Sequence, residues 1–303
     1  MRAPLPPASK EKRLMTNAKT IRLVMPQWQG GNNPAYKFGA ELLAWLAPET
    51  SSPVIHIPVA AADHSLINEN GIMGRQQIVN QLHGAQAAIK QHLPDKIVVL
   101  GGDCLVDLAP FAWLSERYND NFGILWLDAH PDVMSPAQFS HSHAHVLGAL
   151  MGHGDSDLTS VVSTPVAGNR VMIAGINNPN QYEKEFIAAQ GINTCSPADV
   201  KAGFSTIREW INREGITCLA IHFDLDVLNY KNFRSVLFAN PSANESDYDG
   251  IGKGQLEISE VVTLIKQVNE LTTIVGIGIA EHLPWDAINL KTMLENLPLL
   301  NGK

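Results

Sequence analysis

Short β-branched apolar runs alternate with segments of helical periodicity along almost the whole chain, and this alternation constrains the fold more than any other feature. The runs are apolar throughout rather than alternating with polar residues. Such runs, separated by helices, are typical of a parallel sheet that helices cover on both faces. The predicted strands are Ile21–Met25, Val54–Val59, Lys96–Leu100, Gly123–Leu127, Arg170–Ile176, Thr217–Phe223 and Thr273–Ala280, and the clearest helices are Gln76–His92, Ala198–Asn212 and Ile258–Val268.

The domain organisation follows from the same pattern. Residues 1–20 are polar and basic and contain three prolines, so they are predicted to form a flexible tail. Residues 21–303 show no internal repeat and no linker, which predicts a single domain.

The amino-acid composition limits which classes of binding partner are expected. The formal net charge of −8 opposes the neutralisation of phosphates, which argues against nucleic acid as a partner. The apolar runs are too short to span a bilayer, so no membrane association is expected. Three cysteines without a C-x-x-C pair are typical of reduced thiols, which favours a cytoplasmic location. Only 17% of the residues are charged, which favours a homo-oligomer that buries further surface.

Polar clusters follow several of the predicted strands, at the point where each strand ends. In a parallel sheet these ends share one edge, and ligand sites form in the crevice beyond it. We therefore expect distant segments to converge on one place. The clusters are Gly101-Gly102-Asp103-Cys104, Asp128-Ala129-His130-Pro131-Asp132, His222-Phe223-Asp224-Leu225-Asp226 and Ala280-Glu281-His282.

The spacing within these clusters suggests metal ligation. In an extended segment Asp128, His130 and Asp132 lie on one face, and so do Asp224 and Asp226. Four carboxylates in one crevice repel one another unless cations lie between them, and oxygen donors with an imidazole suit divalent ions such as manganese. Carboxylates that cap the following helix are the alternative interpretation of either motif alone.

The ordered motifs resemble those of the arginase/agmatinase ureohydrolases, enzymes that hydrolyse guanidino compounds. That family carries G-G-D-H, D-A-H-x-D, H-G-x-x-x-x-x-L-x-G, S-x-D-x-D and a late glutamate after an apolar strand. This chain has G-G-D-C at 101–104, D-A-H-P-D at 128–132, H-A-H-V-L-G-A-L-M-G at 143–152, H-F-D-L-D at 222–226 and G-I-G-I-A-E at 276–281. The resemblance implies a three-layer α/β/α arginase-like fold on a mostly parallel sheet of about eight strands, and a trimer or hexamer.

The resemblance also implies roles for individual residues. Two divalent ions, manganese in the first place, would be held by a set of six side chains, and a metal-bound hydroxide would attack the guanidinium carbon of a small guanidino or amidino substrate. Glu281 matches the glutamate that pairs with the guanidinium, and His143 matches a proton shuttle to the leaving amine. The six implied ligands are Cys104, Asp128, His130, Asp132, Asp224 and Asp226.

Cys104 stands where the family has its first metal-binding histidine. A thiolate is a soft ligand that favours zinc, cobalt, nickel or iron over manganese. Three outcomes stay open: an altered metal preference, one remaining ion on the His130 side, or no ion. The alternative to metal ligation is that Cys104 is a small buried apolar residue.

Two further departures concern specificity and surroundings. Arginases have R-D-x-D where this chain has Asn177-Asn178-Pro179-Asn180, so the counter-charge for an α-ammonium group is missing. L-Arginine is therefore expected to be a poor substrate, and Asn180 is the candidate contact to the substrate. His222 replaces the family's serine, a change expected to affect the surroundings of the ligands rather than ligation.

Two rival functions remain at this point. One is a catalytically silent arginase-like protein that serves binding or assembly. The other is a mononuclear zinc deacylase that uses Asp128, His130 and Asp224. Glu281 argues against the deacylase because a neutral amide needs no carboxylate to pair with.

Overall fold

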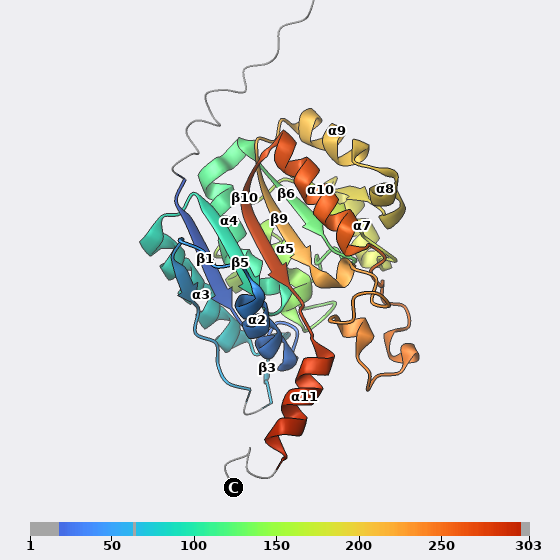
Figure 1. Ribbon diagram of the computed structural model, residues 1–303. Helices are drawn as coiled ribbons and strands as arrows, with labels where there is room; N and C mark the ends of the chain where they lie inside the picture. The colour runs from blue at the N-terminus through green and yellow to red at the C-terminus, as the bar shows by residue number, and fades with distance from the viewer. Residues whose placement is uncertain (1–17, 63–64, 298–303) are drawn as a thin grey trace, which may run out of the picture.

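The apolar runs of the sequence become neighbouring strands of one sheet. The structure is a computed structural model that describes residues 18–62 and 65–297. Eight strands pair in the order β2-β1-β5-β10-β9-β6-β7-β8, and every pairing is parallel (Figure 1). In that order the strands are Val54–His56, Thr20–Met25, Lys96–Gly101, Thr273–Ala280, Cys218–Asp224, Phe122–Leu127, Val171–Ala174 and Asn193–Cys195.

Helices cover both faces of this sheet. A short antiparallel hairpin, β3 (Asn68–Glu69) with β4 (Ile72–Met73), lies outside it. The helices are α2 (Ala35–Leu46), α3 (Arg75–His92), α4 (Leu108–Tyr118), α5 (Val146–Leu150), α6 (Ser156–Thr159), α7 (Gln181–Gln190), α8 (Pro197–Ala202), α9 (Ser205–Glu214), α10 (Ile258–Leu271) and α11 (Trp285–Glu295). The three-layer α/β/α prediction is confirmed. No helix in the described ranges combines the length and the apolar character that crossing a membrane requires.

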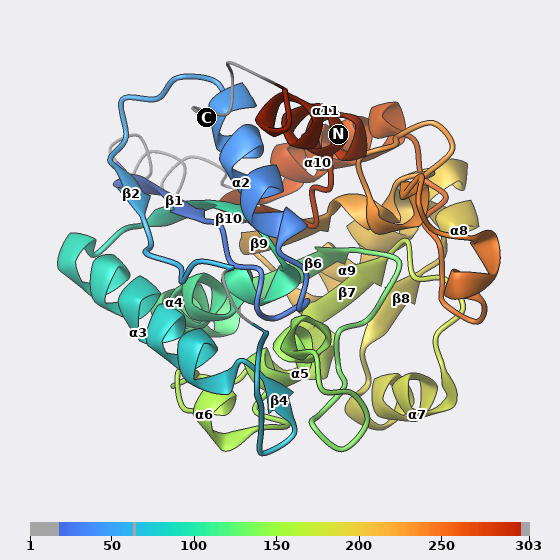
Figure 2. The same cartoon turned by 90° about the horizontal axis from the view of Figure 1, so that it is seen from below.

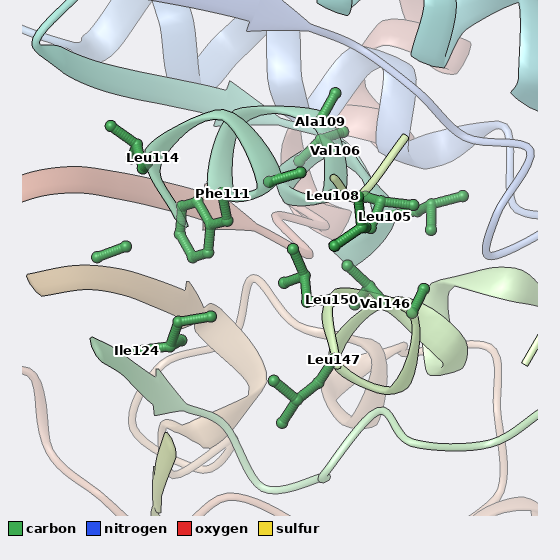
Figure 3. Packing of buried hydrophobic residues seen from close by; sticks show 14 of the residues in the cluster. Leu105, Val106, Leu108, Ala109, Phe111, Leu114, Ile124, Val146, Leu147 and Leu150 are labelled. Atoms are coloured by element: carbon green, nitrogen blue, oxygen red, sulfur yellow. The ribbon is translucent and has the colours of Figure 1, made fainter. Parts of the chain in front are cut away.

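The alternation of side chains along β6 explains the layers. Ile124 and Trp126 join the cluster that contains residues of α3, α4 and α5, while Leu125 and Leu127 join the cluster that contains residues of α8, α9 and α10. Figure 3 shows α4 and α5 packed on the first of these faces, with Phe111 and Leu147 near Ile124. Because both faces are buried, β6 is apolar over its whole length.

Several predictions about individual elements are wrong. The single helix expected over Ala198–Asn212 is two helices, because Gly203 adopts φ 134° and ends α8. Strand β2 ends at His56 rather than Val59. The eighth strand, β8, was not identified because Asn-Thr-Cys carries little apolar signal. The predicted tail of residues 1–20 lies outside the described residues up to residue 17, and β1 already begins at Thr20.

All eight strands end at the same edge of the sheet. Figure 2 looks at the molecule from below, toward the end to which the strand arrows of Figure 1 point. The loops that leave β5, β6, β9 and β10 all start there, and these four strands are neighbours in the order β5-β10-β9-β6. Residues from 104 to 281 can therefore meet in one place, as the sequence predicts.

Candidate metal centre

The four central strands deliver their polar residues to one cavity of about 350 Å³. Asp224 is the last residue of β9, Asp128 follows β6, Glu281 follows β10 and Cys104 begins a short 3₁₀ helix after β5. Six of these polar residues line the cavity, namely Cys104, His130, Asp132, Asp224, Asp226 and Glu281, while Asp128 is completely buried and is not among the lining residues. The expected convergence is thus present.

On one side of the centre, His130 faces Asp128 and Asp226. Its Nδ1 lies 3.4 Å from Asp128 Oδ1 and 3.3 Å from Asp226 Oδ2. Its Nε2 donates to the carbonyl of Gly252 at 2.9 Å. That bond fixes the ring and leaves Nδ1 directed at the carboxylates. These three side chains, called here the His130 side, lie close enough together to hold an ion.

The carboxylates are fixed by bonds from the backbone. Asp128 accepts hydrogen bonds from the amide of His130 at 2.7 Å and from Trp126 Nε1 at 3.0 Å. Asp224 Oδ1 accepts from the amide of Asp226 at 2.6 Å. The side chains converge through turns rather than through the extended geometry expected from the sequence: residues 225–227 form a 3₁₀ helix, and Asp132 adopts φ 49°. A left-handed aspartate is strained, and such strain is often found at functional sites.

On the other side lies Cys104, which is 2% exposed. Its Sγ lies 3.1 Å from Asp224 Oδ2 and 3.5 Å from Glu281 Oε1. Ligand atoms of Cys104, Asp128 and Asp132 also lie within 4.8 Å of one another and of an atom of His222. We call these residues the Cys104 side.

Glu281 joins the Cys104 side to His143. Its Oε1 accepts from the amide of Cys104 at 3.2 Å and lies 3.4 Å from His143 Nδ1. Glu281 also adopts a left-handed φ of 64°. Burial lowers the pKa of His143, but the carboxylate of Glu281 outweighs burial and holds that pKa above its ordinary value. The two residues proposed from the sequence as catalytic therefore touch each other and line the same cavity.

The electrostatics of this cluster fit bound cations. Burial, followed by neighbouring carboxylates, raises the pKa of Asp132 and Asp224 well above the ordinary range. Burial also raises the pKa of the Cys104 thiol, and Asp224 and Glu281 add to the rise. Asp132 Oδ2 and Asp226 Oδ1 are buried and find no hydrogen-bond partner among the described residues. Divalent ions would stabilise the ionised groups and satisfy these orphaned oxygens, so the donor set fits them.

The structure separates Asn180 from the other candidates. Its side chain accepts a hydrogen bond from the amide of Glu183 and caps α7, and Asn180 is exposed and outside the residues that line the cavity. Asn177 and Asn178 donate to the carbonyls of Lys253 and Gly250, so they tie down the neighbouring loop. The Asn177–Asn180 segment is thus bonded to the loop of Gly250 and Lys253, outside the lining of the cavity, and we do not retain Asn180 as a substrate contact.

Several residues that line the cavity were not predicted from the sequence. Tyr36 is buried in the cavity wall, and burial together with Glu281 raises its pKa well above the ordinary value. Glu183 lines the cavity as well, and burial raises its pKa. Its place three residues after Asn180 in a capping box was readable from the sequence, but its position at the cavity was not. The remaining wall is largely apolar and includes Met134, Phe139, Leu237, Phe238 and Ile251.

Comparison with known proteins is consistent with this geometry. The Arginase family model matches residues 45–242, more than half of the 303 residues. An arginase of Staphylococcus aureus (strain MSSA476) is 24% identical over 184 residues, which cover 58% of this chain and 61% of that protein. The matched stretch thus spans about three fifths of that curated relative.

Solved structures resemble the whole fold. The Entamoeba histolytica arginase in complex with L-ornithine superposes with a TM-score of 0.73 at 19% identity, over 88% of this chain and 91% of that one. The Bacillus caldovelox arginase superposes with a TM-score of 0.68 at 21% identity, over 92% and 98%. At these identities the likeness concerns the fold.

Proposed function

The chain belongs to the arginase family, and from this premise we propose that it is a metal-dependent hydrolase that cleaves a C–N bond of a small guanidino or amidino compound. The observation that supports this most is the placement of Glu281 and His143 in contact with each other, beside the buried metal-binding cluster. A guanidinium is a delocalised cation and a weak electrophile. It needs a carboxylate to orient it and a strong nucleophile to react with it.

We assign two divalent ions to the metal centre. Asp128, His130 and Asp226 would hold one, and Cys104, Asp128 and Asp132 would contribute to the other, with Asp224 between the two sides. Manganese is the first choice for the His130 side, whereas the thiol favours zinc, cobalt, nickel or iron on the Cys104 side. Bound there, the ions would supply the activation of water.

The protein's own residues supply orientation and proton transfer. Glu281 pairs with the guanidinium through a buried carboxylate, and Tyr36 shields that carboxylate from water. His143 is only partly buried and lies beside Glu281, where it can pass a proton to the leaving nitrogen. The products are an amine together with urea, or with an amide when the substrate is an amidine.

The cavity favours a substrate without a carboxylate. None of its described lining residues is lysine or arginine, so a carboxylate on the substrate would find no ammonium or guanidinium partner there. L-Arginine carries such a group, and the arginase with bound L-ornithine accepts one. We therefore propose an alkylguanidine or alkylamidine with an apolar or cationic tail rather than L-arginine, the cationic tail being paired with Glu183.

The homo-oligomer is retained as a proposal. Helix α11 extends away from the sheet in Figure 1 and exposes Leu290, Met293 and Leu294. An apolar face of this kind favours burial against another copy of the chain, in the trimer or hexamer expected above. Light scattering on the purified protein measures the mass of the assembly and so tests the proposed oligomer directly.

The activity is tested on ion-free protein that is reloaded with manganese, zinc, cobalt, nickel or iron. The substrate panel contains alkylguanidines that end in a methyl, an amine or a carboxylate, L-arginine, a formimidoyl amino acid and an acyl-lysine. We expect urea from the carboxylate-free guanidines, with the highest kcat/KM in the panel. Free amine from acyl-lysine alone would favour a mononuclear zinc deacylase. No product with any metal would leave a catalytically silent binding protein.

A further inference from the structure

His222 is a buried histidine inside the sheet, directly below the proposed metal centre. It lies on β9 two residues before Asp224, so the two side chains point to the same face. In the register of the sheet His222 stands opposite Trp126 of β6 and Gly278 of β10. Its ring stacks on that of Trp126 with the centroids 3.7 Å apart and the planes at 13°. The imidazole is therefore fixed in place, with no exposed surface.

One nitrogen of this ring is already bonded to a buried carboxylate. Nδ1 lies 2.7 Å from Asp107 Oδ2, and Asp107 is completely buried as well. An ionised carboxylate only accepts, so His222 Nδ1 donates to it, and in the neutral imidazole Nε2 then carries the lone pair. Gly278 makes room for this arrangement, because a Cβ at that position would lie 2.0 Å from both carboxylate oxygens of Asp107.

The other nitrogen is directed at the metal-binding cluster and is unpaired. Nε2 finds no hydrogen-bond partner among the described residues. The nearest carboxylate atom that pairs with it by charge, Asp128 Oδ2, is 3.9 Å away, which is too far for a hydrogen bond. Yet one ring nitrogen of His222 lies within 4.8 Å of ligand atoms of Cys104, Asp128 and Asp132. Nε2 is the nitrogen that Asp107 leaves free for this role. A buried nitrogen without a partner is costly unless something binds it.

From this geometry we infer that His222 Nε2 is a metal ligand on the Cys104 side, together with Cys104, Asp128 and Asp132. The inference rests on the metal centre of the proposed function and deepens it. The imidazole absent at position 104 is then supplied by β9, which β10 separates from β5, at the position where the family pattern has a serine. Asp107 orients the ring as carboxylates commonly orient metal-binding histidines.

The donor set that results is mixed. One sulfur, one nitrogen and two carboxylates form a combination that suits zinc, cobalt or iron better than manganese. The His130 side, with one nitrogen and carboxylates, keeps a harder character. The two ions of one centre are thus expected to differ in identity when several metals are offered together.

The direct test uses cadmium-113 as the probe ion and protein labelled with nitrogen-15 in its histidines. In the wild-type protein we expect two cadmium signals, each coupled to one imidazole nitrogen. His222→Ser should abolish the coupling on the signal that is shifted by the thiolate and leave the other unchanged. His145→Gln, which alters another buried histidine, should change neither. A coupling that survives on the thiolate-shifted signal in His222→Ser overturns the inference.

Affinity provides a second readout, and Asp107→Asn keeps the ring in place should His222→Ser fail to fold. We expect zinc affinity on the Cys104 side, measured by chelator competition, to fall about 10- to 100-fold in Asp107→Asn. The same change should leave zinc affinity on the His130 side within about twofold. Unchanged affinity at both sites would contradict a ligand role for His222. Failure of the wild-type protein to bind any ion would overturn the metal centre itself, and the inference with it.

Discussion

On one side of Asp128 lie His130 and Asp226, and on the other lie Cys104, Asp132 and His222. Both sides contain an imidazole with one nitrogen tied to an acceptor and the other directed at Asp128. His130 is tied through Nε2 to the carbonyl of Gly252, and His222 is tied through Nδ1 to the carboxylate of Asp107. Both rings are thus oriented by a hydrogen bond, but His130 uses Nε2 for it and His222 uses Nδ1.

The two imidazoles differ in where the chain supplies them. His130 sits in a partly exposed loop after β6, within the D-A-H-P-D motif. His222 lies within β9 and is fixed by neighbours on β6 and β10. The first is specified by a local motif, whereas the second depends on three strands meeting in one register. A loop motif can be recognised in a sequence more readily than a set of residues that come together only because three strands pair in one register.

The largest effect is expected from the residue shared by both sides. Asp128→Asn removes a negative charge that both ions would share, so both should be lost and activity should fall by about 10³-fold or more. Metal per chain and kcat/KM report the two losses. Asp157→Asn, a change at a half-exposed aspartate paired with Arg75, is the control and should retain both ions. Two ions retained in Asp128→Asn would contradict the assignment of Asp128 as a ligand that both sides share.

Glu281→Gln separates substrate pairing from ion binding. The amide keeps the shape of the side chain but cannot pair with a guanidinium, and losing one partner of a buried charge pair costs about 2–5 kcal/mol. We expect kcat/KM to fall about 100-fold or more, with the metal content unchanged. The matched change at an exposed glutamate, Glu295→Gln, should be silent. Loss of an ion in Glu281→Gln would instead place Glu281 among the ligands.

A third histidine, the buried His145, shows what happens to an imidazole without a carboxylate partner. His145 Nε2 is bonded to the carbonyl of Phe139, and burial lowers the pKa of His145 from 6.5 to about 4. The folded state therefore binds fewer protons than the unfolded state. The stabilising contribution is complete above pH 6.5 and is lost as the pH falls through about 4.

The expected loss of unfolding free energy at His145 is roughly 3 kcal/mol between these limits. Urea unfolding of the wild type and of His145→Gln as a function of pH measures it. The variant should show the flatter profile. Parallel profiles would mean that folding leaves the pKa of His145 unshifted, and the contrast with the acid-paired His130 would disappear.

The smallest effect concerns Glu183, at the cavity wall. Glutamine is also accepted at this position of a capping box, so Glu183→Gln should preserve the start of α7. We expect KM to rise about tenfold for a guanidine with an amine tail and to stay constant for one with a methyl tail. Steady-state kinetics with the two substrates measure the difference. An equal rise for both would mean that Glu183 contributes no counter-charge.

Much of the fold and part of the site could be predicted from the sequence, for identifiable reasons. Parallel strands end at one edge, so Asp128, Asp224 and Glu281 had to converge once the strands were recognised. The turns at Asp132 and Glu281 could not be predicted, because only a few per cent of residues other than glycine adopt positive φ and no local pattern marks these two positions. Likewise Tyr36 reaches the cavity from α2 only through tertiary packing, and no local pattern signals it.

His222 illustrates the limit most clearly. From the sequence it was a change in the surroundings of the ligands, because the two ligand aspartates of the motif, Asp224 and Asp226, are retained. Its unpaired nitrogen becomes visible only when Asp107 and Gly278 are placed beside it. The glycine matters for the space that it leaves, which a sequence pattern does not reveal.

The central claim is that one centre holds two ions through two unlike sides. Its most direct test is the metal content per chain of the wild-type protein, His130→Ala and Cys104→Ser after loading with manganese and zinc together. The account predicts two ions in the wild type and one in each variant, with the remaining ion mainly zinc in His130→Ala and mainly manganese in Cys104→Ser. Two ions retained in either variant, or no ion in the wild type, would contradict it.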